Sequence, residues 1–93
     1  MVGVLIEVPG GTQEMYDKAM KDLELTANGG DWPEGLISHI AGPNGDGWTV
    51  VDTWQSKAEF EKFVQERLGK AMQVAGMPRV EPKFFDIYLV HQT

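Results

Sequence analysis

An aspartate in the middle of an apolar segment is the first residue whose surroundings suggest chemistry. The run from Trp48 to Trp54 is short and rich in β-branched and aromatic residues, which predicts a β-strand with Trp48, Asp52 and Trp54 on one face. A carboxylate inside a sheet is costly unless it is hydrogen-bonded, paired with a cation or exposed to a wet cavity. Asp52 is therefore a candidate catalytic residue.

His39 is the candidate partner of Asp52. It lies on the preceding predicted strand, residues 36–41, and a Gly- and Asn-rich turn joins this strand to the next. Counted across that turn, His39 falls near Val50 or Val51, so the hairpin register decides whether it shares the face of Asp52. If it does, a His–Asp pair beside indole rings could act as a general base. The alternative is a structural hydrogen bond between two buried polar groups.

Aromatic and apolar side chains surround this strand in the sequence and predict a pocket for a flat, apolar ligand between the sheet and the helices. The alternative is that the large rings only fill a small core. Trp32, in a loop, is either a lid over the pocket or a contact at a dimer rim. The predicted pocket residues are Trp48, Val50, Trp54, Phe60, Phe63 and Tyr88.

Metal and phosphate sites have little support in the sequence. There is no cysteine, and neither His39 nor His91 has a second histidine at helical spacing. The glycines lie in turns and form no phosphate-binding loop between a strand and a helix. We therefore expect no metal and no cofactor.

The order of predicted elements is β-α-β-β-α-β in one domain, residues 1–93. Capping residues Thr12 and Ser56 begin the two helices, and Ser56 forms a capping box with Glu59. This order predicts a ferredoxin-like α+β fold, a four-stranded antiparallel sheet with both helices on one face. The predicted strands are 2–8, 36–41, 48–54 and 80–91, and the predicted helices are 13–27 and 57–75.

Composition limits the partners. A net charge of −6 repels phosphate backbones, so we expect no nucleic acid, and no run approaches the roughly 18 apolar residues that a membrane span needs. The chain is expected to be cytoplasmic, because it has no basic, apolar leader at its start. The first and last predicted strands are apolar on both faces, which predicts a homodimer packed sheet to sheet.

The segment from Gly47 to Ser56, followed by Glu59, Phe60 and Phe63, resembles the third strand and second helix of the antibiotic biosynthesis monooxygenase group. These small proteins are dimeric α+β barrels with a ligand cleft in each subunit. The resemblance implies a homodimer and an enzyme of the cofactor-independent monooxygenase type, or an isomerase or cyclase, acting on a small apolar or aromatic substrate.

The chain departs from two subgroups of this family. Quinone-forming members resemble it at Trp54 but place Asn and Tyr where this sequence has Val50 and Phe60. Haem-degrading members use a histidine on the second helix, and residues 56–76 contain none. A non-catalytic module that binds a small hydrophobic ligand, or a dimeric interaction domain, therefore remains as the alternative function.

Overall fold

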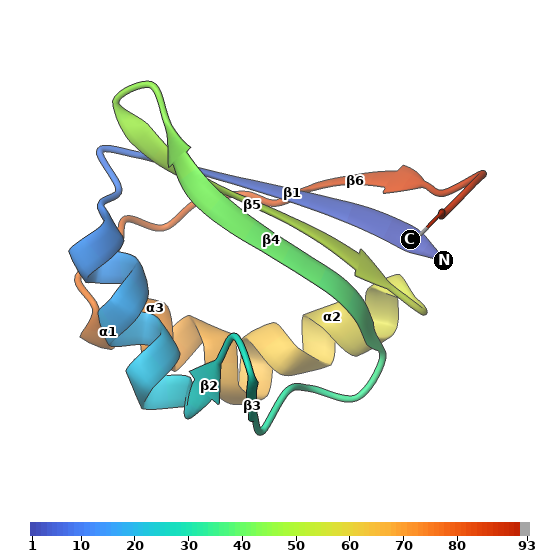
Figure 1. Cartoon of the computed structure of the whole chain (residues 1–93), viewed down its shortest axis with the longest axis horizontal. Helices are drawn as coiled ribbons and strands as arrows, with labels where there is room; N and C mark the ends of the chain where they lie inside the picture. The colour runs from blue at the N-terminus through green and yellow to red at the C-terminus, as the bar shows by residue number, and fades with distance from the viewer. Residues whose placement is uncertain (92–93) are drawn as a thin grey trace.

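The computed structural model describes residues 1–91 and contains one four-stranded antiparallel sheet with its helices on one face (Figure 1). The order of strands across the sheet is β4-β5-β1-β6, as a β-α-β-β-α-β chain with right-handed crossovers requires. The predicted ferredoxin-like α+β fold is therefore confirmed. The strands are β1 (Val2–Pro9), β4 (Leu36–Asn44), β5 (Gly47–Trp54) and β6 (Lys83–Asp86).

The main core lies between the sheet and the helices. Four alternate residues of β1 point inward, because successive side chains of a strand face opposite sides. These four residues are buried. Trp54 and Phe60 pack against them and are almost completely enclosed. The buried hydrophobic residues of β1 are Val2, Val4, Ile6 and Val8.

The second helix runs without interruption through three segments, α2 (Lys57–Phe63), the π-helical η1 (Val64–Leu68) and α3 (Gly69–Val74). It begins as the sequence predicts, with the Ser56 hydroxyl accepting the Glu59 backbone N–H at 3.2 Å and donating to the Glu59 carboxylate at 3.0 Å. Of the helices in the described residues, none is long and apolar enough to cross a membrane.

The first helix is shorter than predicted. The sequence prediction extended it to residue 27, but α1 (Gln13–Leu23) ends at Leu23, where Glu24 adopts a left-handed conformation. A small hairpin follows, formed by β2 (Leu25–Thr26) and β3 (Gly29–Gly30). Leu25 would lie on the polar face of a longer helix; ending the helix early lets Leu25 turn into the core, where it is buried.

The last strand is also shorter than the predicted range of 80–91. It pairs with β1 only over residues 83–86, opposite residues 2–5 of β1. Pro82 has no N–H to extend the ladder in one direction. In the other direction, the backbone bonding of β6 to the β1 segment reaches Ile87, whose N–H donates to the Met1 carbonyl at 3.2 Å.

Replacing Ser56 with alanine should lower the free energy of unfolding by about 1 kcal/mol, because the N-terminus of α2 loses the side chain that satisfies it. Chemical denaturation followed by tryptophan fluorescence measures the loss. The matched variant Ser56→Thr keeps the hydroxyl and should retain most of the stability. Equal stability of the alanine and threonine variants would show that the cap contributes nothing.

Candidate functional site

The hairpin register places His39 directly opposite Asp52 on the helix-facing side of the sheet. Strand β4 continues to Asn44, so that only Gly45 and Asp46 form the turn, and Gly45 supplies the positive φ of 61° that this tight turn needs. The sequence left the register open because it predicted a longer loop. The two candidate catalytic residues are thus brought together.

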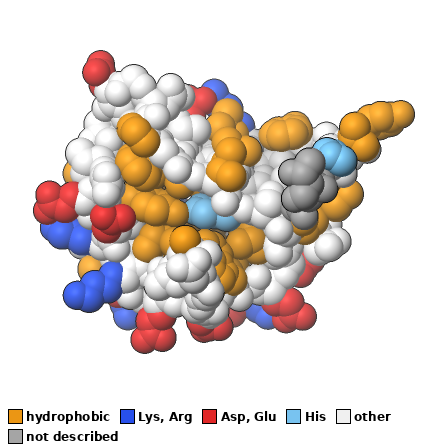
Figure 2. Space-filling view, viewed as in Figure 1, with side chains coloured by type: hydrophobic (Ala, Val, Ile, Leu, Met, Phe, Trp, Pro, Cys, Tyr) orange, Lys and Arg blue, Asp and Glu red, His pale blue; other side chains and the backbone are white. Residues whose placement is uncertain are grey.

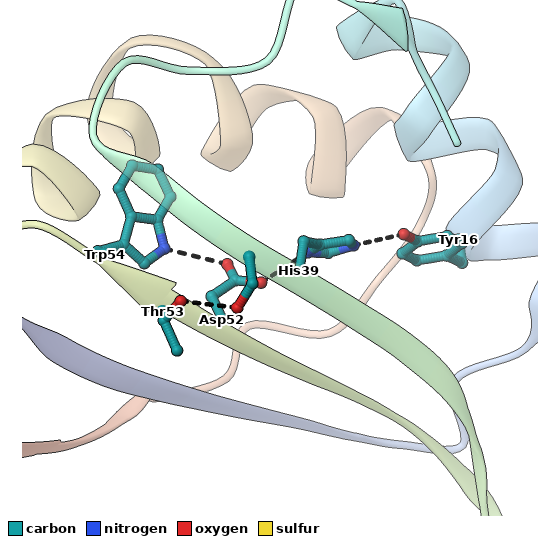
Figure 3. A network of polar contacts seen from close by, with 6 residues as sticks. Tyr16, His39, Asp52, Thr53 and Trp54 are labelled. Atoms are coloured by element: carbon teal, nitrogen blue, oxygen red, sulfur yellow. Dashed lines mark hydrogen bonds and ion pairs between the residues drawn. The ribbon is translucent and has the colours of Figure 1, made fainter. Parts of the chain in front are cut away.

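Asp52 is the centre of a short chain of polar contacts (Figure 3). One carboxylate oxygen, Oδ1, lies 2.6 Å from His39 Nδ1, and the other, Oδ2, accepts a hydrogen bond from Trp54 Nε1 at 3.1 Å. Only 7% of the Asp52 side chain and 18% of the His39 side chain are exposed. Both oxygens of the buried carboxylate are therefore satisfied, as burial of a polar group requires.

Tyr16, on α1, extends this chain on the far side of the imidazole. Its hydroxyl lies 2.6 Å from His39 Nε2. Because an ionised carboxylate only accepts hydrogen bonds, the proton of a neutral His39 belongs on Nδ1, which leaves Nε2 to accept from the Tyr16 hydroxyl. In the sequence, the spacing of Tyr16 with Met20 and Leu23 predicts only the apolar face of a helix and indicates no histidine partner.

The surroundings of Tyr16 keep its hydroxyl protonated. Burial raises the pKa of Tyr16 to about 12, with further contributions from the negative charges of Asp52 and Asp17. The phenol is thus a hydrogen-bond donor at neutral pH. In this arrangement Asp52 orients the imidazole, and His39 Nε2 is the basic atom that a reacting group would meet once the Tyr16 hydroxyl moves aside or passes on a proton.

A partly enclosed cavity of about 70 Å³ lies beside this chain of contacts, between the sheet and the helices. Tyr16, His39 and Asp52 contribute polar atoms to its wall, and the rest of the wall is largely apolar. Four of the predicted pocket residues line it: Trp48, Val50, Trp54 and Phe63.

Two predicted pocket residues lie elsewhere. Phe60 packs edge-on against Trp54 and Phe84, with ring centroids 5.5 and 5.7 Å away, and fills the core below the cavity. Tyr88 follows the end of β6 and is fully exposed. The prediction for Tyr88 assumed a strand to residue 91, but the paired part of the strand ends at Asp86.

Trp32 separates the cavity from a groove on the surface. Its ring lies 5.3 Å from that of His39, and its Nε1 donates to the Thr26 carbonyl at 3.2 Å, which ties it to the β2–β3 hairpin. The groove has a volume of about 610 Å³ and shares Tyr16, His39 and Trp32 with the cavity wall. Figure 2 shows hydrophobic side chains gathered around this hollow, with a histidine visible at its base.

Within residues 1–91, no group of three or more His, Asp or Glu side chains is arranged to hold a metal ion. His39 already has partners on both ring nitrogens, and His91 lies exposed near the end of the chain. The polar groups at the cavity are those expected for proton transfer and hydrogen bonding to a ligand.

The shifted pKa of Tyr16 makes stability depend on pH in the alkaline range. The pKa is about 12 in the folded protein against an ordinary value of 10.0, so folding favours the protonated phenol. This contribution is complete below pH 10 and is lost as the pH rises through 12. Ultraviolet titration of tyrosinate should show a step near pH 12 that disappears in Tyr16→Phe and remains in Tyr88→Phe. A step unaffected by Tyr16→Phe would contradict the burial of this hydroxyl.

Several solved structures that match this fold are described as antibiotic biosynthesis monooxygenases. A candidate antibiotic biosynthesis monooxygenase from Deinococcus radiodurans matches with a TM-score of 0.68 and 6% identity, over 100% of this chain and 98% of the other. A candidate monooxygenase of the same type from Chloroflexus aurantiacus matches with a TM-score of 0.66 and 11% identity, over 98% of this chain and 96% of the other. SnoaB, a cofactor-independent oxygenase from Streptomyces nogalater, matches with a TM-score of 0.58 and 11% identity, over 96% of this chain and 93% of the other.

No protein-family model matches the sequence, and no curated protein matches it significantly. At 6–11% identity, these structural matches concern the arrangement of the chain, and the residues at the cavity must be interpreted on their own chemistry. The fold of this chain is that of the antibiotic biosynthesis monooxygenases, as the resemblance of its third strand and second helix predicts.

Proposed function

We propose that this protein is a small-molecule enzyme in which His39 acts as a general base on a small apolar or aromatic substrate. The observation that carries the proposal is the chain from Asp52 through His39 to Tyr16 at the wall of an apolar cavity. A buried carboxylate behind an imidazole favours removal of a proton from carbon, because it stabilises the imidazolium that forms. Trp54 holds the second carboxylate oxygen and so fixes the direction of the first.

The size of the cavity limits how a substrate binds. An apolar protein cavity of about 150 Å³ is large enough to bind benzene. The cavity here has a volume of about 70 Å³, so a ring system enters only if it also occupies the surface groove or displaces Trp32. The substrate is therefore expected to be flat, with one end beside His39 and the other beneath the β2–β3 hairpin.

Oxygenation is the reaction that the neighbouring structures favour, because SnoaB is a cofactor-independent oxygenase. In such a reaction His39 would take a proton from an activated carbon, and the conjugated carbanion would transfer electrons to molecular oxygen. For anthrone the balance is one anthrone plus one O₂ giving one anthraquinone plus one water. An isomerase or cyclase would use the same base without consuming oxygen.

Hydrogen–deuterium exchange at the acidic carbon tests the base directly. In D₂O without oxygen, the wild-type protein should accelerate exchange in anthrone or the smaller 2-indanone, and Asp52→Asn and His39→Gln should lose about 10²-fold or more. The matched control Thr53→Val changes the next residue of β5, on the opposite sheet face, and should keep the wild-type rate. Oxygen uptake with anthrone then separates an oxygenase from an isomerase or cyclase.

Exchange at the same rate in wild type, Asp52→Asn and His39→Gln would overturn the enzymatic proposal. The candidate that would then replace it is a non-catalytic module that binds a small hydrophobic ligand. One observation favours that second candidate: both oxygens of Asp52 and both ring nitrogens of His39 already have partners within the chain. Binding of 2-indanone without any exchange would support it.

We also infer that two copies of the chain pack through the outer face of the sheet. Ile40, Val51 and Leu5 form an apolar row across three strands on this face, and Ile40 is 67% exposed. Phe85, 55% exposed, lies against Gly3, where any side chain would collide with its ring. A second copy would cover this apolar surface with an identical one, which is the arrangement of most homodimers.

Sedimentation velocity tests the dimer. The wild-type protein should sediment as a dimer at micromolar concentration, and Ile40→Glu should shift it to a monomer because a charge would be buried in the interface. Val74→Glu is the matched control, since Val74 is similarly exposed, at 61%, but lies on α3 in the helix layer. A monomeric wild type, or equal dissociation by both variants, would contradict the proposed interface.

A further inference from the structure

One buried side-chain hydrogen-bond donor in the described part of the chain has no partner. The indole nitrogens of the other two tryptophans are occupied, Trp32 by the Thr26 carbonyl and Trp54 by Asp52. Trp48 is only 7% exposed, and its Nε1 makes no hydrogen bond to any described residue. A buried donor without an acceptor lowers stability, so such groups are few in folded proteins and call for an explanation.

Trp48 is held at the wall of the same cavity that His39 and Tyr16 line. Its backbone pairs with Val8 in the centre of the sheet, and its ring centroid is 5.1 Å from that of Tyr16. Gly11 packs directly over it, so closely that a Cβ at this position would approach the Trp48 Cβ to 2.9 Å. The indole is therefore held in place by its neighbours, beside the chain that leads to the base.

We propose that the Trp48 indole N–H determines specificity by donating a hydrogen bond to an oxygen of the ligand. The ligand class is a flat carbonyl compound or phenol, whose ring occupies the apolar space and whose oxygen accepts the hydrogen bond that no described residue accepts. The inference rests on the proposed function, since His39 would remove a proton from such a compound. An enolate carries more negative charge on oxygen than its ketone, so the hydrogen bond strengthens as the reaction proceeds.

A pair of ligands that differ by one oxygen tests this role without measuring activity. In ¹H–¹⁵N spectra of the wild-type protein, 2-indanone should move the Trp48 indole proton downfield, whereas indane, which has no acceptor, should not. The three indole signals can be assigned from their contacts to neighbouring protons, so the measurement needs no variant at Trp48.

Affinities provide the second measurement. Trp48→Phe keeps an aromatic ring but removes the N–H, and should weaken binding of 2-indanone by about 3- to 10-fold while leaving the affinity for indane nearly unchanged. Trp32→Phe is the matched control, because the N–H it removes is already used within the chain. In that variant the ratio of the two affinities should stay at its wild-type value.

The possible failures are distinguishable. If both ligands bind with similar affinity and 2-indanone does not shift the Trp48 indole proton signal, the proposed role of Trp48 is wrong. The role of His39 as a general base is then decided separately by the exchange experiment. If His39 catalyses hydrogen–deuterium exchange in 2-indanone but the ligand leaves the Trp48 indole signal unchanged, only the role of Trp48 is overturned. If neither ligand binds, the cavity is no ligand site and both proposals fail.

Discussion

The buried carboxylate of Asp52 is the constraint on which the site depends. A charge enclosed to this degree is tolerated only when both oxygens are hydrogen-bonded, and the two groups that do this come from different elements. Trp54 lies on the same strand, two residues further on, so its indole is on the same face by strand geometry alone. His39 comes from β4, and its position opposite Asp52 ties the hairpin register to the satisfaction of the charge.

The same constraint links the helix layer to the sheet. Tyr16 reaches from α1 to the second nitrogen of His39, so the polar chain crosses the space between the layers and stands at the side of the cavity. A general base needs an oriented imidazole in a largely apolar, partly closed site, and these contacts provide both conditions. Trp48, whose indole N–H has no partner in the described residues, lines the same cavity. The proposed base and the proposed donor would together suit a substrate in which charge moves from carbon to oxygen.

The fold was predictable because each element carries its own signals: the short apolar run of β1, the Ser56 capping box and the glycine-rich turns. The boundaries that failed depend on tertiary structure, which local patterns do not contain. Helix α1 stops early because Leu25 is buried in the core, and β6 pairs with β1 only over residues 83–86, after Pro82, which has no N–H for the ladder. Within the site, the parity of β5 indicated Asp52 and the two indoles, whereas the contact of Tyr16 with His39 spans 23 residues and had no sequence signal.

The tautomer of His39 tests the central claim most directly, because the whole arrangement requires Asp52 to hold a proton on Nδ1. Long-range ¹H–¹⁵N spectra of the imidazole at neutral to mildly alkaline pH distinguish the two ring nitrogens. When His39 is neutral, its proton is expected on Nδ1, with Nε2 accepting from Tyr16, and the tautomer should change in Asp52→Asn. A wild-type His39 protonated at Nε2 alone would contradict this claim, since Nδ1 would then face the carboxylate without a proton.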